Sequence, residues 1–488
     1  MLRSIPHLLR PPAGLLALIV CATAFALALP AAAQASRGQV SIMQDDRLVY
    51  NDATRSSTLD TMRGLGADWV RVNVMWNRFA PGASSKRRPA FAETDSNAYS
   101  RGQMELLDRI VIAIRARGME PLLTPTAPAP LWASAGGRGP VYKPSPTRFG
   151  RFVQALGERY NGRFTPAGGS SALPRVRRWS IYNEPNQPGW LQPQYSAGRP
   201  YAPHLYRKIY VASEAALRRT GHRTSRILIG ETAPLGDRRR YSRSKMQPGR
   251  FISELFCLGS RDRACRSPRT IRTSGFAHHP YAKFRNDTPR TRGSRDEFPF
   301  GDLRGLTRLL DRAGRAHRVR RGLSVYNTEY GWQTNPPDRL FGVSQSRQAR
   351  YLNESEFSSY LMGRVKSYGQ YLLRDDPDTD GFQTGLVEID GDAKPALDAF
   401  RTALRLGLRQ GRITVWGHLR PESSGTVVEL EHAKTSRDPW RRSGGRLKTD
   451  GRGYIGTRRN YRSGRWRLVW TDASGATRTS RVASSPRR

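Results

Sequence analysis

Cysteine is scarce in this 488-residue chain, which limits the ways in which the fold can be cross-linked. Only three cysteines are present, and Cys21 lies in an apolar N-terminal stretch. The other two, Cys257 and Cys265, are close in sequence and have no histidine or third cysteine beside them, which argues against a zinc site. In an exported chain such a pair favours a disulfide over two free thiols.

Acidic residues are also few, since 40 Asp and Glu stand against 82 Lys and Arg. The formal net charge of +42 is compatible with a polyanionic partner. The arginines are scattered along the chain, and neither a basic helix nor an aromatic platform indicates specific binding of nucleic acid. Two explanations stay open: an anionic cell-envelope polymer as a partner, or an arginine-rich surface without one.

Several signatures of cofactor and nucleophile chemistry are missing from the sequence. We find no phosphate-binding glycine loop, no Ser-His-Asp signature and no metal-ligand spacing. No segment repeats at the period of a solenoid. We therefore expect chemistry that needs neither a cofactor nor a metal.

A long apolar stretch occurs once, at the N-terminus. Arg3 and Arg10 precede an apolar run over 13–29, and a proline and three alanines follow it. A charged start, an apolar middle and a small-residue end are typical of a signal peptide. We predict a signal peptide over 1–33 and a secreted, extracellular mature protein, with an uncleaved anchor as the alternative. No later stretch is apolar enough to span a bilayer.

Strand-like and helix-like stretches alternate from residue 39 to about residue 405, which is typical of parallel α/β folds. Eight strand-then-helix units predict a closed (β/α)8 TIM barrel over 34–408. An open doubly wound sheet is the alternative, but no glycine-rich loop follows the first strand. A long helix is expected over 348–373. The expected strands are 40–43, 69–74, 120–124, 176–182, 226–230, 275–279, 323–327 and 381–388.

The C-terminal part of the chain has a different pattern. From about residue 413 short alternating strands are separated by Gly, Ser and Asp turns. This predicts a small antiparallel β-sandwich domain over 409–488. Such a domain either binds carbohydrate or packs against the barrel as a structural prop.

Two glutamates occupy matching places in the predicted barrel. Glu184 follows the fourth strand and Glu329 follows the seventh, and the C-terminal ends of barrel strands form the active site. Strands three positions apart face each other across the barrel mouth, so the two carboxylates should meet there. A pair of carboxylates on either side of a sugar is what cleavage of a glycosidic bond requires.

Five segments carry a resemblance to a known group of enzymes. In chain order they are RVNVMW, WSIYNEPNQPGW, FAHHPYA, YNTEYGWQT and TGLVEIDGDAKPALDAF. Over residues 40–405 the chain resembles the clan A glycoside hydrolases, and the family 5-like and family 39-like TIM-barrel members best. Asn-Glu-Pro alone is a weak signal, but all five segments in the right order are a strong one.

The resemblance implies a role for each matching residue. Glu184 would be the acid/base and Glu329 the nucleophile of a retaining double displacement. Asn183 would bind the sugar 2-hydroxyl, and Arg71 and Tyr281 would keep Glu329 ionised.

Aromatic and histidine side chains complete the expected site. His279 is either a substrate-binding residue or part of a turn, and Trp190 and Trp332 are candidate sugar-stacking surfaces. The tryptophan usual after the eighth strand is missing, and Gln383 or Glu388 lies near its place.

The implied activity is hydrolysis of the O-glycosidic bonds of a β-linked polysaccharide or oligosaccharide. The alternative is a non-catalytic protein that binds carbohydrate or an anionic cell-envelope polymer on a glycosidase scaffold.

Overall fold

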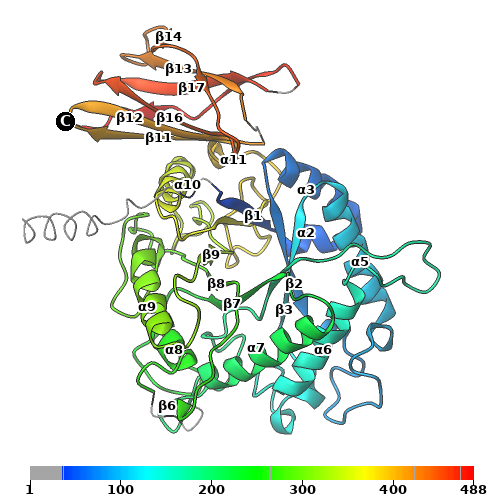
Figure 1. The fold of residues 1–488 in the computed structure, drawn as a ribbon. Helices are drawn as coiled ribbons and strands as arrows, with labels where there is room; N and C mark the ends of the chain where they lie inside the picture. Colours follow the sequence, from blue (N-terminus) through cyan, green and yellow to red (C-terminus); the bar gives the residue numbers. More distant parts are fainter. Residues whose placement is uncertain are drawn as a thin grey trace, which may run out of the picture.

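The structure is a computed structural model that describes residues 36, 38–260, 262, 265–421, 424–472 and 474–487. The predicted signal peptide and Cys21 lie outside these residues. Within the described ranges no helix is both long enough and apolar enough to cross a membrane. The described chain forms a barrel with a β-sandwich beside it (Figure 1).

Eight parallel strands form the barrel sheet, in the order β10-β1-β2-β3-β4-β7-β8-β9. The two ends of this order meet, because Val325 in β9 pairs with Val365 just before β10. The (β/α)8 TIM barrel predicted from the sequence is therefore confirmed. The strands are β1 (Val40–Gln44), β2 (Trp69–Met75), β3 (Glu120–Thr126), β4 (Arg178–Ser180), β7 (Arg226–Thr232), β8 (Gly275–His278), β9 (Val325–Asn327) and β10 (Ser367–Tyr371).

Helices follow the strands and surround the sheet (Figure 1). Helix α5 illustrates the reason, since Leu107, Ile110, Val111 and Ile114 recur at helical spacing and are all buried on its inner face. The helices are α2 (Asp46–Tyr50), α3 (Asp52–Gly64), α5 (Arg101–Ala116), α6 (Pro146–Arg159), α7 (Ala202–Arg219), α8 (Pro248–Leu255), α9 (Leu303–Arg315), α10 (Gln345–Tyr360) and α11 (Pro395–Arg401), with the single turn α4 (Trp76–Phe79) after β2.

The eighth strand is not where the sequence predicts it. Helix α10 ends early and β10 follows, so the predicted helix over 348–373 and the predicted strand over 381–388 are both wrong. Apolar residues continue at near-helical spacing beyond α10, which conceals the boundary. The segment 381–388 contains apolar residues because it packs as a loop over the end of the barrel, where Gln370 Nε2 donates to the backbone oxygen of Thr384 (2.8 Å).

Gly369 lets β10 lie close to the segment that follows β9. A Cβ atom at this position would lie 2.9 Å from the backbone nitrogen of Glu329 and 3.0 Å from the carbonyl carbon of Thr328. Any side chain would therefore displace the backbone that carries Glu329.

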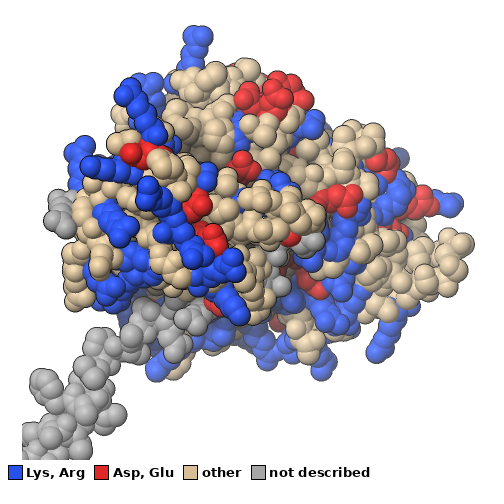
Figure 2. All heavy atoms as spheres, turned by 90° about the horizontal axis from the view of Figure 1, so that it is seen from above, with Lys and Arg blue, Asp and Glu red and all other residues tan. Residues whose placement is uncertain are grey.

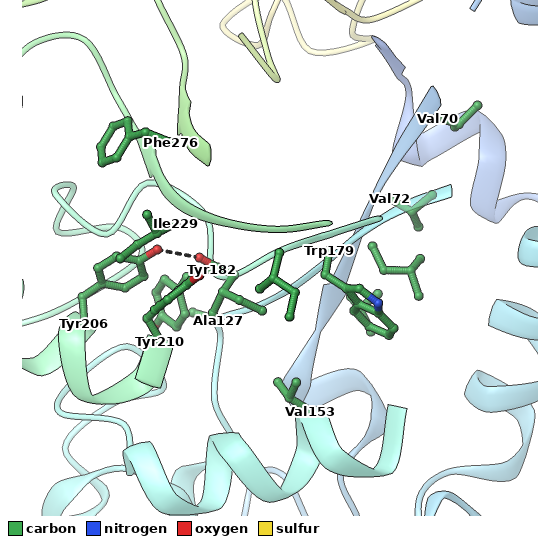
Figure 3. Close-up of a cluster of buried hydrophobic side chains, with 14 of the residues drawn as sticks. Val70, Val72, Ala127, Val153, Trp179, Tyr182, Tyr206, Tyr210, Ile229 and Phe276 are labelled. Atoms are coloured by element: carbon green, nitrogen blue, oxygen red, sulfur yellow. Dashed lines mark hydrogen bonds between the residues drawn. The ribbon is translucent and has the colours of Figure 1, made fainter. Parts of the chain in front are cut away.

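Aromatic side chains fill the layer between α7 and the strands (Figure 3). The ring of Tyr206 on α7 lies 6.2 Å from that of Tyr182, which follows β4. The Tyr206 hydroxyl donates to the backbone oxygen of Ile181 (2.9 Å) and accepts from the backbone nitrogen of Gly230 (2.8 Å). One buried side chain thus ties together the ends of β4 and β7.

A disulfide joins Cys257 and Cys265, as predicted, with their Cα atoms 5.4 Å apart. The bridge lies directly after α8. Arg207 of α7 donates to the backbone oxygen of Leu255 (3.0 Å) beside it, so the connection after α8 is held against α7.

The C-terminal domain is an antiparallel β-sandwich, which confirms the predicted fold class. One sheet has the order β11-β12-β16, and the other has the order β14-β13-β17-β18, with β15 and β19 at its side. Apolar residues of both sheets, among them Leu406, Val415, Leu430 and Trp466, form one core. The strands are β11 (Thr402–Arg409), β12 (Arg412–Leu419), β13 (Val427–Ala433), β14 (Arg441–Arg442), β15 (Leu447–Lys448), β16 (Tyr454–Asn460), β17 (Arg465–Thr471), β18 (Thr477–Thr479) and β19 (Ala483–Ser484).

The domain boundary predicted at 408/409 cuts off the first strand of the sandwich, because β11 begins at Thr402, directly after α11. The alternation that marks a strand is visible in β11, but Leu404 and Leu406 also fit a continuation of the preceding helix. The segment is a strand because it pairs with β12 along its whole length.

Helix α10 lies beside the sandwich (Figure 1), and its residue Glu356 joins the barrel to the sandwich. Its carboxylate lies 2.5 Å from Arg420 Nη2 and 2.5 Å from His418 Nδ1. Arg420 also donates to Ser41 Oγ (3.2 Å) and to the backbone oxygen of Phe400 (2.7 Å). We call Glu356, His418 and Arg420 the interface cluster.

Lys and Arg cover much of the molecular surface on the side of the sandwich, with Asp and Glu in smaller groups (Figure 2). The sequence from residue 402 to residue 488 holds 20 Lys and Arg but only 6 Asp and Glu. For its size, the smaller domain therefore has a larger excess of basic residues than the rest of the chain.

Candidate active site

Polar side chains from five strands meet at one end of the barrel. Arg71 lies on β2, Glu184 follows β4, Glu231 lies on β7, His279 follows β8 and Glu329 follows β9. The backbone of Glu184 (φ 39°) and that of Glu231 (φ 50°) are both in the left-handed region, which non-glycine residues rarely adopt and which is frequent at functional sites.

The two predicted catalytic glutamates come together. One carboxylate oxygen of Glu184 and one of Glu329 lie within 4.8 Å of each other. His279 lies between them, with Nδ1 3.0 Å from Glu184 Oε1 and 3.6 Å from Glu329 Oε2. The Glu184 side chain is 20% exposed and that of Glu329 is 9% exposed, so Glu184 is the more open to solvent.

Arg71 links three of these strands. Its Nη1 donates to Glu329 Oε2 (2.9 Å), and its Nη2 donates to Asn183 Oδ1 (2.6 Å) and Glu231 Oε2 (2.9 Å). A hydrogen bond from Arg71 to Gln44 completes the set. The guanidinium is fully buried, and its position therefore fixes that of the Glu329 carboxylate.

Tyr281 reaches Glu329 from the other side. Its hydroxyl donates to Glu329 Oε1 (2.9 Å). Each oxygen of Glu329 thus has its own donor, Tyr281 on one and Arg71 on the other. Such fixation of both oxygens holds a carboxylate in a single orientation.

Glu231 is the functional residue that the sequence reasoning missed. It is fully buried, and its Oε2 accepts from Arg71 and lies 2.5 Å from His279 Nε2. We call Arg71, Glu231 and His279 the mouth cluster. The predicted fifth strand ends at Gly230, two residues before the end of β7, so Glu231 was not recognised as a polar residue at the C-terminal end of a strand.

The charges of the mouth cluster stabilise one another. Burial alone would raise the pKa of Glu231, but Arg71 and His279 outweigh it and lower the pKa to about 2. Burial alone would lower the pKa of His279, but the carboxylates of Glu329, Glu184 and Glu231 raise it to about 10. Near neutral pH Glu231 is therefore ionised and His279 is an imidazolium.

Burial raises the pKa of Glu329, and the charge of Glu184 acts in the same direction. His279, Arg71 and Tyr281 lower it. Arg71 and Tyr281 thus lower the pKa of Glu329, as predicted, but the opposite effect of burial on this pKa is larger.

Glu184, His279 and Glu329 are close enough together to raise the question of a metal ion. Both ring nitrogens of His279 face carboxylate oxygens, Nδ1 toward Glu184 and Nε2 toward Glu231. A doubly protonated ring has no lone pair for a metal, so the arrangement fits proton sharing between acids.

Trp332 does not have the predicted role. It is 3% exposed, its Nε1 donates to the Tyr330 hydroxyl (2.6 Å), and its ring lies 4.6 Å from that of Tyr351. A buried ring offers no face to a sugar, so the prediction that it binds substrate is wrong. Trp190, which is only partly buried, stays a prediction.

The loop after β10 places a different aromatic residue beside the site. Phe382 is 39% exposed, and its ring lies 5.7 Å from that of Tyr281. Its neighbour Gln383 is buried and donates to the backbone oxygen of Asp378 (2.8 Å). Glu388 accepts from Gln345 Nε2 of α10 (2.8 Å).

His278, adjacent to the site, belongs to the core. Its Nε2 donates to the backbone oxygen of Phe298 (2.7 Å), and its Nδ1 lies 2.8 Å from Thr232 Oγ1. Burial lowers the pKa of His278 to about 4. The imidazole is therefore neutral, and it holds the loop after β8 in place.

Neither a family model nor a curated protein matches the sequence. Solved structures do match it. A monomeric β-xylosidase from Caulobacter crescentus CB15 is similar at 14% identity and a TM-score of 0.50, over 88% of this chain and 96% of that one. A glucosidase from Croceicoccus marinus is similar at 12% identity and a TM-score of 0.52, over 92% of this chain and 97% of that one. The resemblance stated from the sequence is thereby confirmed for the fold: the chain has the TIM-barrel fold of these two enzymes.

Proposed function

We propose that the protein is a retaining glycoside hydrolase that cleaves β-linked oligosaccharides or polysaccharides by double displacement. The observation that carries this proposal is the approach of Glu184 and Glu329, with oxygens within 4.8 Å of each other. Retaining enzymes hold their two carboxyl groups about 5–5.5 Å apart, and inverting enzymes about 6.5–9.5 Å apart. The shorter gap has room for an anomeric carbon but not for an additional attacking water.

In the first step Glu329 attacks the anomeric carbon while the bond to the leaving oxygen breaks. Glu184, the more exposed acid, gives its proton to that oxygen, and a glycosyl ester of Glu329 forms. Arg71 and Tyr281 each hold one oxygen of Glu329, so the carboxylate is oriented before the sugar arrives.

In the second step Glu184, now ionised, takes a proton from a water molecule. The resulting oxygen attacks the anomeric carbon, and the ester bond to Glu329 breaks. The bond between His279 and Glu184 stabilises the negative charge that Glu184 carries between the two steps.

Three side chains are our candidates for holding the sugar. The Asn183 amide oxygen accepts from Arg71 (2.6 Å), which leaves the amide NH2 group to donate to a hydroxyl. The exposed ring of Phe382 lies beside Tyr281, and with Trp190 it is a candidate stacking surface. The two similar enzymes, a β-xylosidase and a glucosidase, support a glycoside of a small sugar as the substrate.

We also propose that the protein is secreted. The charged and apolar pattern of the N-terminus supports export. The disulfide between Cys257 and Cys265 supports an oxidising compartment.

A second candidate function is binding of an anionic cell-envelope polymer by the β-sandwich. It is favoured by the excess of 20 basic over 6 acidic residues in 402–488. Binding of this kind weakens steeply as salt is added. A salt titration of binding to an anionic polysaccharide, beside a neutral one of equal length, tests it; equal binding to both would exclude it.

A panel of aryl β-glycosides tests the proposed hydrolysis. We expect turnover by the wild-type protein and a loss of about 10²- to 10⁴-fold in the Glu184→Ala variant. Glu388→Gln is the matched control, since Glu388 bonds to α10, and it should keep full activity. No turnover of any glycoside by the wild-type protein would contradict the proposal and favour a non-catalytic carbohydrate binder.

The stereochemistry of the product tests the retaining mechanism separately. Proton NMR of the sugar released in the first seconds should show the β-anomer. For Glu184→Ala, added azide should restore turnover and yield the β-glycosyl azide, because azide needs no general base. An α-anomer from the wild-type protein would establish inversion instead.

A further inference from the structure

Glu231 is a third carboxylate at the site, and its place differs from that of the catalytic pair. It has no exposed surface, so it is closed to a sugar. Its oxygens have four donors: Arg71 (2.9 Å), His279 (2.5 Å) and Thr328 (3.1 Å) on Oε2, and Ser180 on Oε1.

Glu231 contacts the two cations that contact the catalytic glutamates. Arg71 connects it to Glu329, and His279 connects it to Glu184. A change in its charge would therefore reach both members of the pair through one intermediate side chain each.

The protons of His279 follow from its surroundings. Its Nε2 faces Glu231, and its Nδ1 faces Glu184 and, at 3.6 Å, Glu329. Arg71 and the Tyr281 hydroxyl also lie beside these carboxylates, and the preceding histidine, His278, is held by Thr232 and Phe298. A ring between acids on both sides retains both of its protons.

We propose that Glu231 is a positioning residue that keeps His279 doubly protonated and Arg71 aligned, so that the two catalytic carboxylates share one proton. This inference rests on the proposed function. With Glu231 ionised, the mouth cluster carries one net positive charge, which balances one of the two catalytic carboxylates. The electrically neutral site then holds one proton on the pair, which is the state that the first step requires.

Glu231→Gln tests this assignment, since it keeps the size of the side chain and removes its charge. The readout is the ¹⁵N NMR signal of the His279 ring, assigned by its loss in a His279→Gln variant and followed from pH 5 to pH 10. We expect the wild-type ring to stay doubly protonated beyond pH 8 and the variant ring to lose a proton at least one pH unit lower. An unchanged titration would overturn the proposal.

Kinetics give a second readout that a merely structural residue would not move. Because Glu231 does not touch the sugar, kcat should fall at least tenfold while KM changes less than twofold, and the pH profile of kcat should change. If Glu231→Gln lowered the stability but left the pH profile of kcat unchanged, Glu231 would have only a structural role.

Two neighbouring hydroxyls provide matched variants. Ser180→Ala and Thr328→Val each remove one hydrogen bond to Glu231 and leave its charge in place. Each should move the His279 titration less than Glu231→Gln does, and the double variant should move it further than either. If Glu231→Gln does not fold, an unchanged titration in the double variant overturns the proposal. The NMR readout needs no substrate, so failure of the proposed hydrolysis would be recognised separately.

Discussion

Two buried clusters in this molecule have the same composition. The mouth cluster unites Glu231 with Arg71 and His279, and the interface cluster unites Glu356 with Arg420 and His418. In both, an ionised glutamate in the interior has an arginine and, at 2.5 Å, a histidine as partners.

The second nitrogen of each histidine makes the difference. That of His279 faces Glu184, an ionisable group open to solvent, whereas that of His418 donates to the backbone oxygen of Arg452 (2.9 Å). A ring between two acids can pass on a change of charge. A ring between an acid and a carbonyl group can only hold two parts of the chain together. The same three residue types can thus transmit a change of charge at the barrel mouth or hold two domains together at the interface.

The largest effect should come from Glu329→Gln, which removes the proposed nucleophile at the mouth. Turnover of an aryl glycoside should fall at least about 10³-fold. Burial raises the pKa of Glu329, so its charge opposes folding near neutral pH, and calorimetry at pH 7 should give an equal or higher midpoint of unfolding. If Glu329→Gln lost stability but kept turnover, the mouth would be a structural site and not a catalytic one.

At the interface we expect the opposite result. Glu356→Gln leaves Arg420 buried without its charge partner, and removing one member of a buried pair costs about 3–5 kcal/mol of stability. Turnover per folded molecule should stay the same. The control is Glu429→Gln on the sandwich surface, where the solvent-exposed pairs with Arg442 and Arg446 should contribute little to stability. Urea titration compares the two variants.

The contribution of Glu231 to stability should depend on pH in the acid range. The pKa of Glu231 falls from 4.5 to about 2 on folding, so its contribution is complete above pH 4.5 and is lost as the pH falls toward 2. The shift corresponds to about 3 kcal/mol. Stability measured between pH 5 and pH 2 should fall less steeply in Glu231→Gln than in the wild-type protein; parallel curves would contradict the assignment.

The disulfide gives a reference that lies in neither cluster. Replacing Cys257 and Cys265 by serine opens a short loop, and the loop-closure entropy corresponds to about 2–3 kcal/mol. Thermal unfolding with and without reductant should show that reductant affects only the wild-type protein. Turnover should be preserved, since the bridge lies after α8.

The smallest effect should come from Phe382→Ala. Loss of a stacking ring should raise KM about tenfold, which is about 1.4 kcal/mol, with little change in stability because the ring is partly exposed. Trp332→Ala is the informative contrast, since removal of its buried ring should cost about 3–5 kcal/mol of stability. A larger rise in KM from Trp332→Ala would restore the role first predicted for it.

The sequence was sufficient to predict the barrel and the meeting of Glu184 with Glu329, because polar residues directly follow apolar strands at both positions. The sequence was insufficient where no change from apolar to polar residues marks the end of an element. The apolar residues of β10 continue those of α10, and the eighth strand was therefore misplaced. Glu231 was overlooked because the predicted strand stops at Gly230, whereas β7 extends to Thr232.

Other features depend on contacts that no local pattern encodes. Trp332 is a residue type that often stacks on sugars, but its ring is covered by Tyr351. The bond of Arg71 to Glu231 joins residues 160 positions apart. The interface cluster needs the sandwich to be docked on α10 before its charges can pair.

Gly369 gives the architecture a further consequence. A single methyl group there would meet the main chain of Glu329 and Thr328. The position of Glu329 relative to Glu184 therefore depends on the absence of a side chain at Gly369, and alanine there would move the backbone of Glu329 without replacing any side chain of the site.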